Sequence, residues 1–192
     1  FSKVLNLIFI QNGYGKYCID MEVNDISAIE IPCKYYVEVS RKALTDRLTR
    51  EDKDLLLQIF VRDMKDLRAK MEEGKKYDKK VLILTEPLCT LDVRERIFRD
   101  IVAMYENEAQ VFIKPHPRDV LDYATLFADY PQFEGSMPME MLNFFEDLHF
   151  DKVIGVLTEL KAVTFADETV RLGPDFMDKY EDPAIHRQNE RI

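Results

Sequence analysis

The chain has 192 residues, of which 46% are hydrophobic and 33% are charged, so it is long enough to bury a substantial core and has an ordinary globular composition. Its formal net charge of −9 argues against a general nucleic-acid binder, because such binders neutralise phosphates with many Lys and Arg residues, so any anion site must be local. The three cysteines, Cys18, Cys33 and Cys89, lack the paired spacing of a zinc site, so we expect reduced thiols without a chemical role.

The first part of the chain reads as an irregular stretch followed by one long helix. Residues 1–40 show no sustained periodicity. From Thr49 to Gly74 apolar side chains recur on one helical face, which predicts a single helix. Thr49 with Asp52 three residues later resembles a capping box, and Gly74 supplies a left-handed stop. A polar hinge follows over residues 75–80.

The rest of the chain alternates runs typical of buried strands with runs of helical periodicity. We expect strands at residues 81–85, 109–115, 132–135, 151–157 and 168–173, and helices at residues 91–107, 119–130 and 138–148. Such alternation predicts an α/β fold, a Rossmann-like parallel sheet with helices on both faces. Ligands bind beyond the carboxyl ends of such strands, which selects four dipeptides for inspection: Thr85-Glu86, His116-Pro117, Gly135-Ser136 and Leu157-Thr158.

Residues 114–119 read Lys-Pro-His-Pro-Arg-Asp, and the two prolines restrict the backbone on both sides of His116. Protonated imidazole, ammonium and guanidinium groups all donate charge-assisted hydrogen bonds, so His116, Lys114 and Arg118 form a reasonable cradle for a phosphate. A surface turn with a solvated His116 is an equally good interpretation of this pattern alone. Asp119 is expected to cap the following helix.

Two later strand ends add polar groups. Ser136, Pro138 and Glu140 fall at the opening turn of a predicted helix, where free amides attract anions. The Glu140 carboxylate can accept both hydroxyls of a ribose, although a first-turn glutamate that stabilises the helix dipole is the favoured interpretation of this pattern alone. Thr158 follows a predicted strand, so its hydroxyl and the next amides can bind the same phosphate, or can equally well cap a helix.

Together these elements resemble the bacterial sialyltransferases, and most closely glycosyltransferase family 52, which includes lipooligosaccharide and capsule sialyltransferases. His116 and Pro117 match the His-Pro motif that binds the phosphate of CMP-sialic acid in that group. Pro138-Met139-Glu140 matches a Pro-x-Glu segment whose carboxylate holds the cytidine ribose. The resemblance covers most of the chain, including the linker-like stretch from Pro32 to Phe60.

The resemblance implies a GT-B architecture of two Rossmann-like domains. The chain would then divide into 1–48, a linker or remnant of the N-terminal acceptor domain, 49–78, a linking helix and hinge, and 79–192, the nucleotide-sugar-binding domain. It also implies an inverting transfer of sialic acid to a cell-surface glycan, with neither a metal ion nor a cofactor. His116 would be catalytic by stabilising or protonating the departing phosphate, assisted by Lys114, Arg118 and Thr158.

The sequence departs from the sialyltransferase pattern at two places. The sialyltransferases place two adjacent hydroxyl residues after the following strand, whereas Leu157 and Thr158 stand here. Either one hydroxyl suffices with the amides, or the donor is not CMP-sialic acid. Their general base lies in an Asp/Glu-Asp/Glu-Gly motif of the N-terminal domain. Glu72-Glu73-Gly74 fits that pattern but lies at the end of a predicted helix, so we interpret it as a helix terminus.

Two other functions stay open. Another GT-B transferase would use a different nucleotide-activated donor, such as CDP-glycerol or a UDP-sugar, because a phosphate-binding turn does not identify the sugar. A non-catalytic α/β regulatory domain would carry residues 114–118 as a solvated turn. His149, between a predicted helix and a predicted strand, is interpreted as a boundary residue.

We expect a nucleotide-sugar donor and a glycan acceptor as partners, no nucleic acid, and a cytoplasmic location. A homodimer rests on the resemblance alone. The cluster of Lys75, Lys76, Lys79 and Lys80 is compatible with peripheral association at the inner face of an anionic membrane, although a solvated linker is favoured.

Overall fold

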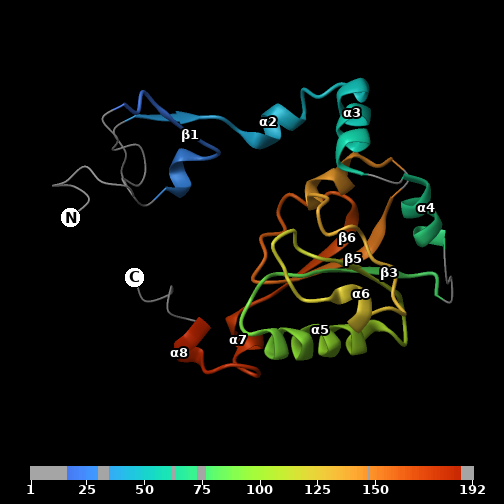
Figure 1. Cartoon of the computed structure of the whole chain (residues 1–192). Coiled ribbons are helices and arrows are strands. Elements are labelled where there is room, and N and C mark those ends of the chain that lie inside the picture. Colours follow the sequence, from blue (N-terminus) through green and yellow to red (C-terminus); the bar gives the residue numbers. More distant parts are fainter. Residues whose placement is uncertain (1–16, 30–34, 62–63, 73–76, 147, 187–192) are drawn as a thin grey trace. The chain divides into compact units, whose positions relative to one another are not determined.

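The computed structural model describes residues 17–29, 35–61, 64–72, 77–146 and 148–186 (Figure 1). The chain separates into two compact units, Phe1–Lys53 and Asp54–Ile192, and each unit is described by itself. None of the helices in the described ranges is long and apolar enough to span a lipid bilayer.

The first unit contains a pair of parallel strands that sequence reasoning missed. Its described elements are β1 (Met21–Val23), η1 (Ile26–Ala28, a 3-10 helix), β2 (Tyr36–Glu38) and α2 (Arg41–Thr45). β1 and β2 pair in parallel, with Met21 opposite Tyr36. Three-residue strands are too short to show the alternation that would predict them, so residues 1–40 read as irregular. Ser40 Oγ accepts from the Ala43 amide at 3.2 Å and caps α2.

The single helix predicted from Thr49 to Gly74 is wrong, because the structure has two helices there. α3 spans Arg50–Phe60 and α4 spans Met64–Glu72. The predicted capping box is confirmed: the Thr49 amide donates to Asp52 Oδ2 at 2.9 Å, and the Asp52 amide donates to Thr49 Oγ1 at 3.1 Å. The apolar periodicity runs through both helices and therefore carries no signal for the break. The predicted stop at Gly74 lies outside the described residues.

The second unit is built on a parallel sheet, as predicted, and this sheet has four strands rather than the five expected. Its strands are β3 (Lys80–Leu84), β4 (Gln110–Lys114), β5 (Phe150–Val156) and β6 (Ala166–Leu172), in the spatial order β4-β3-β5-β6. Val81 of β3 lies opposite both Val111 of β4 and Lys152 of β5. After β4 the chain therefore crosses back over β3 to form β5 on the other side. Open α/β sheets bind ligands at the carboxyl ends of the strands where the order reverses in this way.

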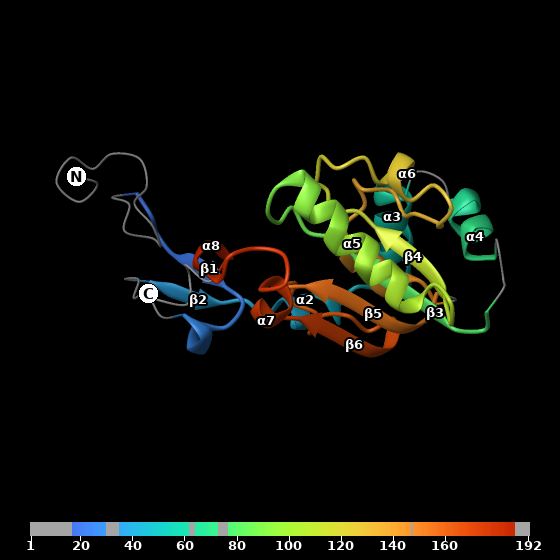
Figure 2. The same ribbon diagram turned by 90° about the horizontal axis from the view of Figure 1, so that it is seen from below.

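Helices cover both faces of this sheet, which confirms the predicted layers (Figures 1 and 2). One face carries α5 (Leu91–Tyr105), α6 (Tyr123–Leu126) and α7 (Pro174–Met177), and the other carries α3, α4 and the 3-10 helix η2 (Met139–Phe144). Successive side chains of a strand point to opposite faces. Leu82 and Leu84 accordingly join the cluster on the α3 side, and Val81 and Ile83 join the cluster on the α5 side.

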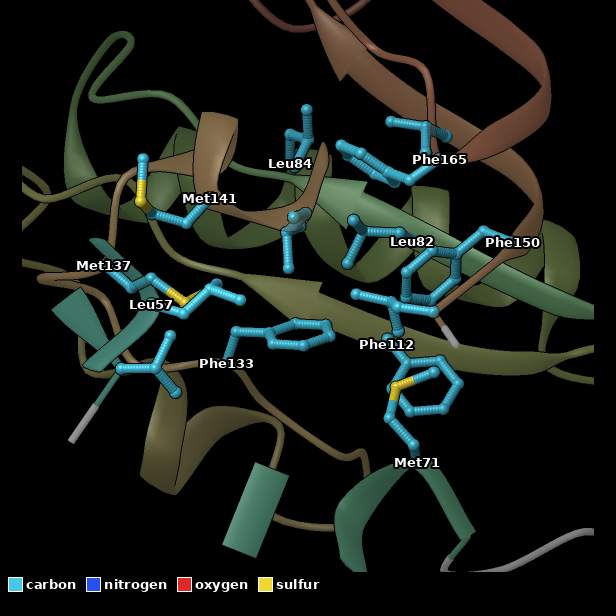
Figure 3. Packing of buried hydrophobic residues seen from close by; sticks show 14 of the residues in the cluster. Leu57, Met71, Leu82, Leu84, Phe112, Phe133, Met137, Met141, Phe150 and Phe165 are labelled. Atoms are coloured by element: carbon cyan, nitrogen blue, oxygen red, sulfur yellow. The ribbon is translucent and has the colours of Figure 1, made fainter. Parts of the chain in front are cut away.

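Aromatic rings are prominent in the cluster on the α3 side (Figure 3). Phe150 is fully buried and meets Phe112 and Phe165 edge to face, with ring centroids 5.4 and 6.1 Å apart. Leu57 of α3 and Met71 of α4 belong to the same cluster. Each such aromatic pair contributes about 0.5–1.5 kcal/mol beyond the burial of its area. These rings lie in the same cluster as Leu57 and Met71, through which α3 and α4 join it.

The segment between β4 and β5 is less regular than predicted. The helix expected after β4 is only α6, and Gln132 Nε2 donates to the carbonyls of Tyr123 and Phe127 at its end, both at 2.9 Å. The strand expected next is a single bridge between Gln132 and Ile113. The helix expected before β5 is the short η2. Beyond β6 and α7, the last described element is α8 (Pro183–His186).

Candidate functional site

The carboxyl ends of β3 and β4 are joined through Thr85, which follows β3 and is 3% exposed. Its amide donates to the Lys114 carbonyl at 3.1 Å, and its hydroxyl oxygen accepts from the His116 amide at 3.0 Å. The turn of residues 114–119, which we call the His-Pro turn, is therefore fixed to an inner strand of the sheet at the residue that carries the imidazole.

The imidazole of His116 is held in one orientation. Its Nδ1 accepts a hydrogen bond from the Arg118 amide at 3.1 Å, so the neutral ring carries its proton on Nε2. Nε2 lies 4.0 Å from Glu86 Oε2, which is beyond hydrogen-bonding distance. With 23% of its side chain exposed, His116 is neither buried in packing nor freely solvated. It presents an N–H donor to the carboxyl edge of the sheet.

Thr158 contacts the other oxygen of the same carboxylate. It follows β5 through Leu157, whose φ of 59° lies in the left-handed region. Thr158 Oγ1 lies 3.1 Å from Glu86 Oε1 and 3.2 Å from the Val156 carbonyl, and donates toward both. A β-carbon on Gly155 would lie 2.9 Å from Thr158 Cβ. Glycine is therefore required at this position for the threonine to approach.

Glu86 is the residue that sequence reasoning missed. Its carboxylate lies between the imidazole of His116 and the hydroxyl of Thr158, the two groups that the sequence assigned to a phosphate. The ends of β4, β3 and β5 thus converge on one carboxylate. The sequence did place Glu86 directly after a predicted strand. Its contacts with His116 and Thr158, however, depend on the order of the strands in the sheet, which the sequence does not reveal.

A buried ion pair holds the His-Pro turn to α5. Arg94 and Asp119 form it, with side-chain exposures of 7% and 0%. Arg94 also donates to the carbonyls of Leu88 and Cys89 at 2.6 and 2.9 Å, and Asp119 accepts from the Tyr123 hydroxyl at 2.9 Å. The pair thus has additional hydrogen bonds at both ends, as a buried ion pair requires.

The predicted capping role of Asp119 is wrong. Asp122 caps α6 instead, because its Oδ1 accepts from the Thr125 amide at 3.1 Å. Asp119 is turned inward to Arg94 and Tyr123. Burial, assisted by this carboxylate, raises the pKa of Tyr123 above its usual value, so the tyrosine hydroxyl stays a donor to Asp119.

Lys114 lies in a different environment from the one that a phosphate cradle requires. The residue is 3% exposed, and its ammonium donates to the carbonyls of Pro115 and Gly135 at 2.6 and 3.1 Å. Burial lowers the pKa of Lys114 to about 8, against the opposing effect of the Glu134 and Glu140 carboxylates. We therefore correct its role: Lys114 ties the end of β4 to the segment around Gly135.

Residues 134–140, which we call the ribose segment, carry the groups that the sequence assigned to a ribose. Ser136 and Glu140 are exposed, and Ser136 Oγ donates to Glu134 Oε1 at 2.8 Å. Pro138 directly precedes η2, and Glu140 lies in its first turn. The predicted opening turn is therefore present, although it begins a 3-10 helix rather than an α-helix.

The ribose segment lies against the His-Pro turn, because a β-carbon on Gly135 would be 3.6 Å from Pro115 Cβ. Pro117 and Arg118 are exposed on the turn itself. The residues assigned to phosphate and to ribose thus lie at one edge of the sheet, at the carboxyl ends of its strands.

Comparison with known proteins places the chain in a family. A Haemophilus influenzae relative, described only as an uncharacterized protein, is 27% identical over 137 residues, which cover 69% of this chain and 42% of that protein. No solved structure matches the chain. The family model of glycosyltransferase family 52 matches residues 2–156, which include the His-Pro turn and the ribose segment. On the strength of that match, this chain belongs to glycosyltransferase family 52.

Proposed function

We propose that this chain is the donor-binding part of a family 52 sialyltransferase and forms the C-terminal half of a GT-B enzyme. The observation that carries the proposal is the convergence of His116 Nε2 and Thr158 Oγ1 on one carboxylate, at the ends of strands on either side of β3. Donors arranged around one anion are suited to a phosphate. The reversal of strand order at the same edge supports a nucleotide site there.

The nucleoside of the donor would extend from the phosphate toward the ribose segment. The Lys114 ammonium holds Gly135 to the end of β4, so this segment stands beside the proposed phosphate position. The exposed carboxylate of Glu140 can accept both hydroxyls of a ribose. Ser136 and Pro138 lie at the same opening turn and would border the nucleoside.

In the proposed reaction a glycan hydroxyl attacks the anomeric carbon of sialic acid while the bond from that carbon to the CMP phosphate oxygen breaks. Attack on the face opposite CMP inverts the configuration of the sugar. A carboxylate base takes the proton of the glycan hydroxyl, and the Nε2–H of His116 donates to the phosphate oxygen on which negative charge develops. The resemblance to the sialyltransferases supports a metal-independent mechanism.

Calorimetry with CMP tests the phosphate role of His116. A hydrogen bond to a charged group contributes about 1.5–3 kcal/mol, so His116→Ala should weaken CMP binding about 10- to 100-fold. His149→Ala is the matched control, because His149 precedes β5 at the amino edge of the sheet, with Nε2 2.9 Å from Asp167, as expected of a boundary residue. Equal affinity of the wild type and His116→Ala for CMP, or no binding by either, would contradict the proposal.

Nucleotide preference separates this proposal from its alternatives. A sialyltransferase should prefer CMP over UMP, UDP and CDP. A GT-B transferase with a different donor would keep the effect of His116→Ala but prefer one of the other nucleotides. A non-catalytic regulatory domain would bind none of them.

A further inference from the structure

Glu86 occupies the position that the proposed function gives to the donor phosphate. Its Oε1 accepts from Thr158 Oγ1 at 3.1 Å, and its Oε2 lies 4.0 Å from His116 Nε2. Carboxylates and phosphates are both anions that accept hydrogen bonds from hydroxyl and imidazole groups. The carboxylate and a donor phosphate therefore compete for the same two groups.

The contacts that hold Glu86 in this position are weak. A hydroxyl has a single proton, and that of Thr158 is shared with the Val156 carbonyl at 3.2 Å. The separation of 4.0 Å from His116 is too long for a hydrogen bond. The phosphate group of CMP offers more acceptor oxygens and more negative charge to both donors than a carboxylate does, so it can take them from Glu86.

The two buried cations at this edge have other partners. The Lys114 ammonium donates to two backbone carbonyls, and the Arg94 guanidinium pairs with Asp119. Neither is therefore placed to neutralise Glu86 when a phosphate arrives. Two like charges a few ångströms apart repel each other strongly at the low effective dielectric of a protein edge, so the arriving phosphate meets Glu86 as a competing anion.

We propose that the Glu86 carboxylate occupies the position of the donor phosphate when no nucleotide is bound, and that nucleotide binding displaces this carboxylate from Thr158 and His116. The inference rests on the proposed function, because it needs a phosphate at this position. The side chain of Glu86 is 25% exposed, so the carboxylate reaches water once it leaves.

Calorimetry on Glu86→Gln and Glu86→Ala tests this inference, with CMP, inorganic phosphate and cytidine as probes. Removal of the competing charge should tighten the binding of CMP and phosphate about tenfold in both variants. Cytidine has no phosphate, so its affinity should stay the same. Glu159→Gln is the matched control: it removes an exposed carboxylate next to Thr158 and should change none of the three affinities.

Unchanged binding of CMP and phosphate by both Glu86 variants would overturn the inference, because Glu86 would then not affect the phosphate. Weaker binding by both would also overturn it, because Glu86 would then help to bind the phosphate. Tighter cytidine binding would overturn it as well, because the effect would not act through the phosphate. If phosphate binding tightens but CMP has no advantage over phosphate, the nucleotide assignment fails while the inference about Glu86 stands. If the wild type and both variants bind neither CMP nor phosphate, both proposals are overturned.

Discussion

The two segments that carry the candidate donor contacts are held in place by different means. The His-Pro turn is anchored to α5 by the buried pair of Arg94 and Asp119. The ribose segment is tied to β4 by the ammonium of Lys114, and its Glu140 side chain is exposed. In the proposed function His116 donates to a phosphate, and such a hydrogen bond weakens steeply when it is misaligned, so the turn that holds His116 would need the more rigid support.

The largest expected effect comes from the support of the His-Pro turn. Arg94→Met leaves the buried Asp119 carboxylate without its partner, which should lower the free energy of unfolding by about 3–5 kcal/mol. Urea unfolding of the wild type and the variant measures the loss. Arg99→Met is the control, because the pair of Arg99 and Glu95 is partly exposed and should contribute less than about 1 kcal/mol.

A double variant sharpens this prediction. Arg94→Met combined with Asp119→Asn removes both charges, so it should regain part of the stability lost in Arg94→Met alone. A loss from Arg94→Met no larger than that from Arg99→Met would show that the ion pair does not support the turn.

The Lys114 ammonium, which holds the ribose segment to β4, should make the free energy of unfolding depend on pH. The pKa of Lys114 is about 8 in the folded chain, against 10.5 for an unperturbed lysine. Between these pH values the unfolded chain binds the extra proton, so this lysine makes the free energy of unfolding rise with pH across the window. A pKa difference of one corresponds to about 1.4 kcal/mol, so the wild type should gain about 3 kcal/mol relative to Lys114→Met.

The two proteins should be unfolded in urea at several pH values from 7 to 10.5 and compared as a difference. Burial raises the pKa of Cys89 to about 11 and that of Tyr130 to about 12, and these groups lower stability at high pH in both proteins alike. Their contributions cancel in the difference. Parallel curves for the wild type and Lys114→Met would contradict the buried ammonium.

The approach of Thr158 to Glu86 depends on a glycine, which gives a smaller expected effect. In Gly155→Ala the new β-carbon would lie 2.9 Å from Thr158 Cβ and 3.1 Å from its Oγ1, so the threonine must move. We expect a loss of about 1–2 kcal/mol in the free energy of unfolding and weaker CMP binding. Gly173→Ala is the control, because a β-carbon there meets nothing within 4 Å and should leave CMP binding unchanged.

The sheet was predictable from the sequence because its buried strands form short, nearly continuous apolar runs. The runs that became β3, β4 and β5 were each placed to within about two residues. The late start of α6 was not predictable, since Asp119, the residue expected to cap this helix, turns inward to Arg94 and Tyr123 and Asp122 caps α6 instead. Local periodicity contains no information about such a contact.

The candidate site was predictable where its geometry is local and unpredictable where it depends on the strand order. The prolines around His116 restrict their own neighbours, so an oriented imidazole could be expected at this strand end. The burial of Lys114 depends on the carbonyl of Gly135, 21 residues further along the chain. The placement of Glu86 between His116 and Thr158 requires β3 to lie between β4 and β5, which composition and periodicity do not reveal.

The smallest expected effect lies in the ribose segment and completes the comparison of the two segments. Glu140→Gln keeps the shape of the side chain but removes its charge, so it should weaken cytidine binding by about 1 kcal/mol, or roughly fivefold. The affinity for 2′,3′-dideoxycytidine, which lacks both hydroxyls, should not change. Because Glu140 is exposed, the free energy of unfolding should change by less than about 1 kcal/mol, much less than in Arg94→Met. Glu134→Gln is the control, because it removes a charge from the same segment and should leave cytidine binding unchanged. Equal losses of cytidine affinity in the two variants would show that the effect comes from the charge of the segment and not from a carboxylate that binds the ribose.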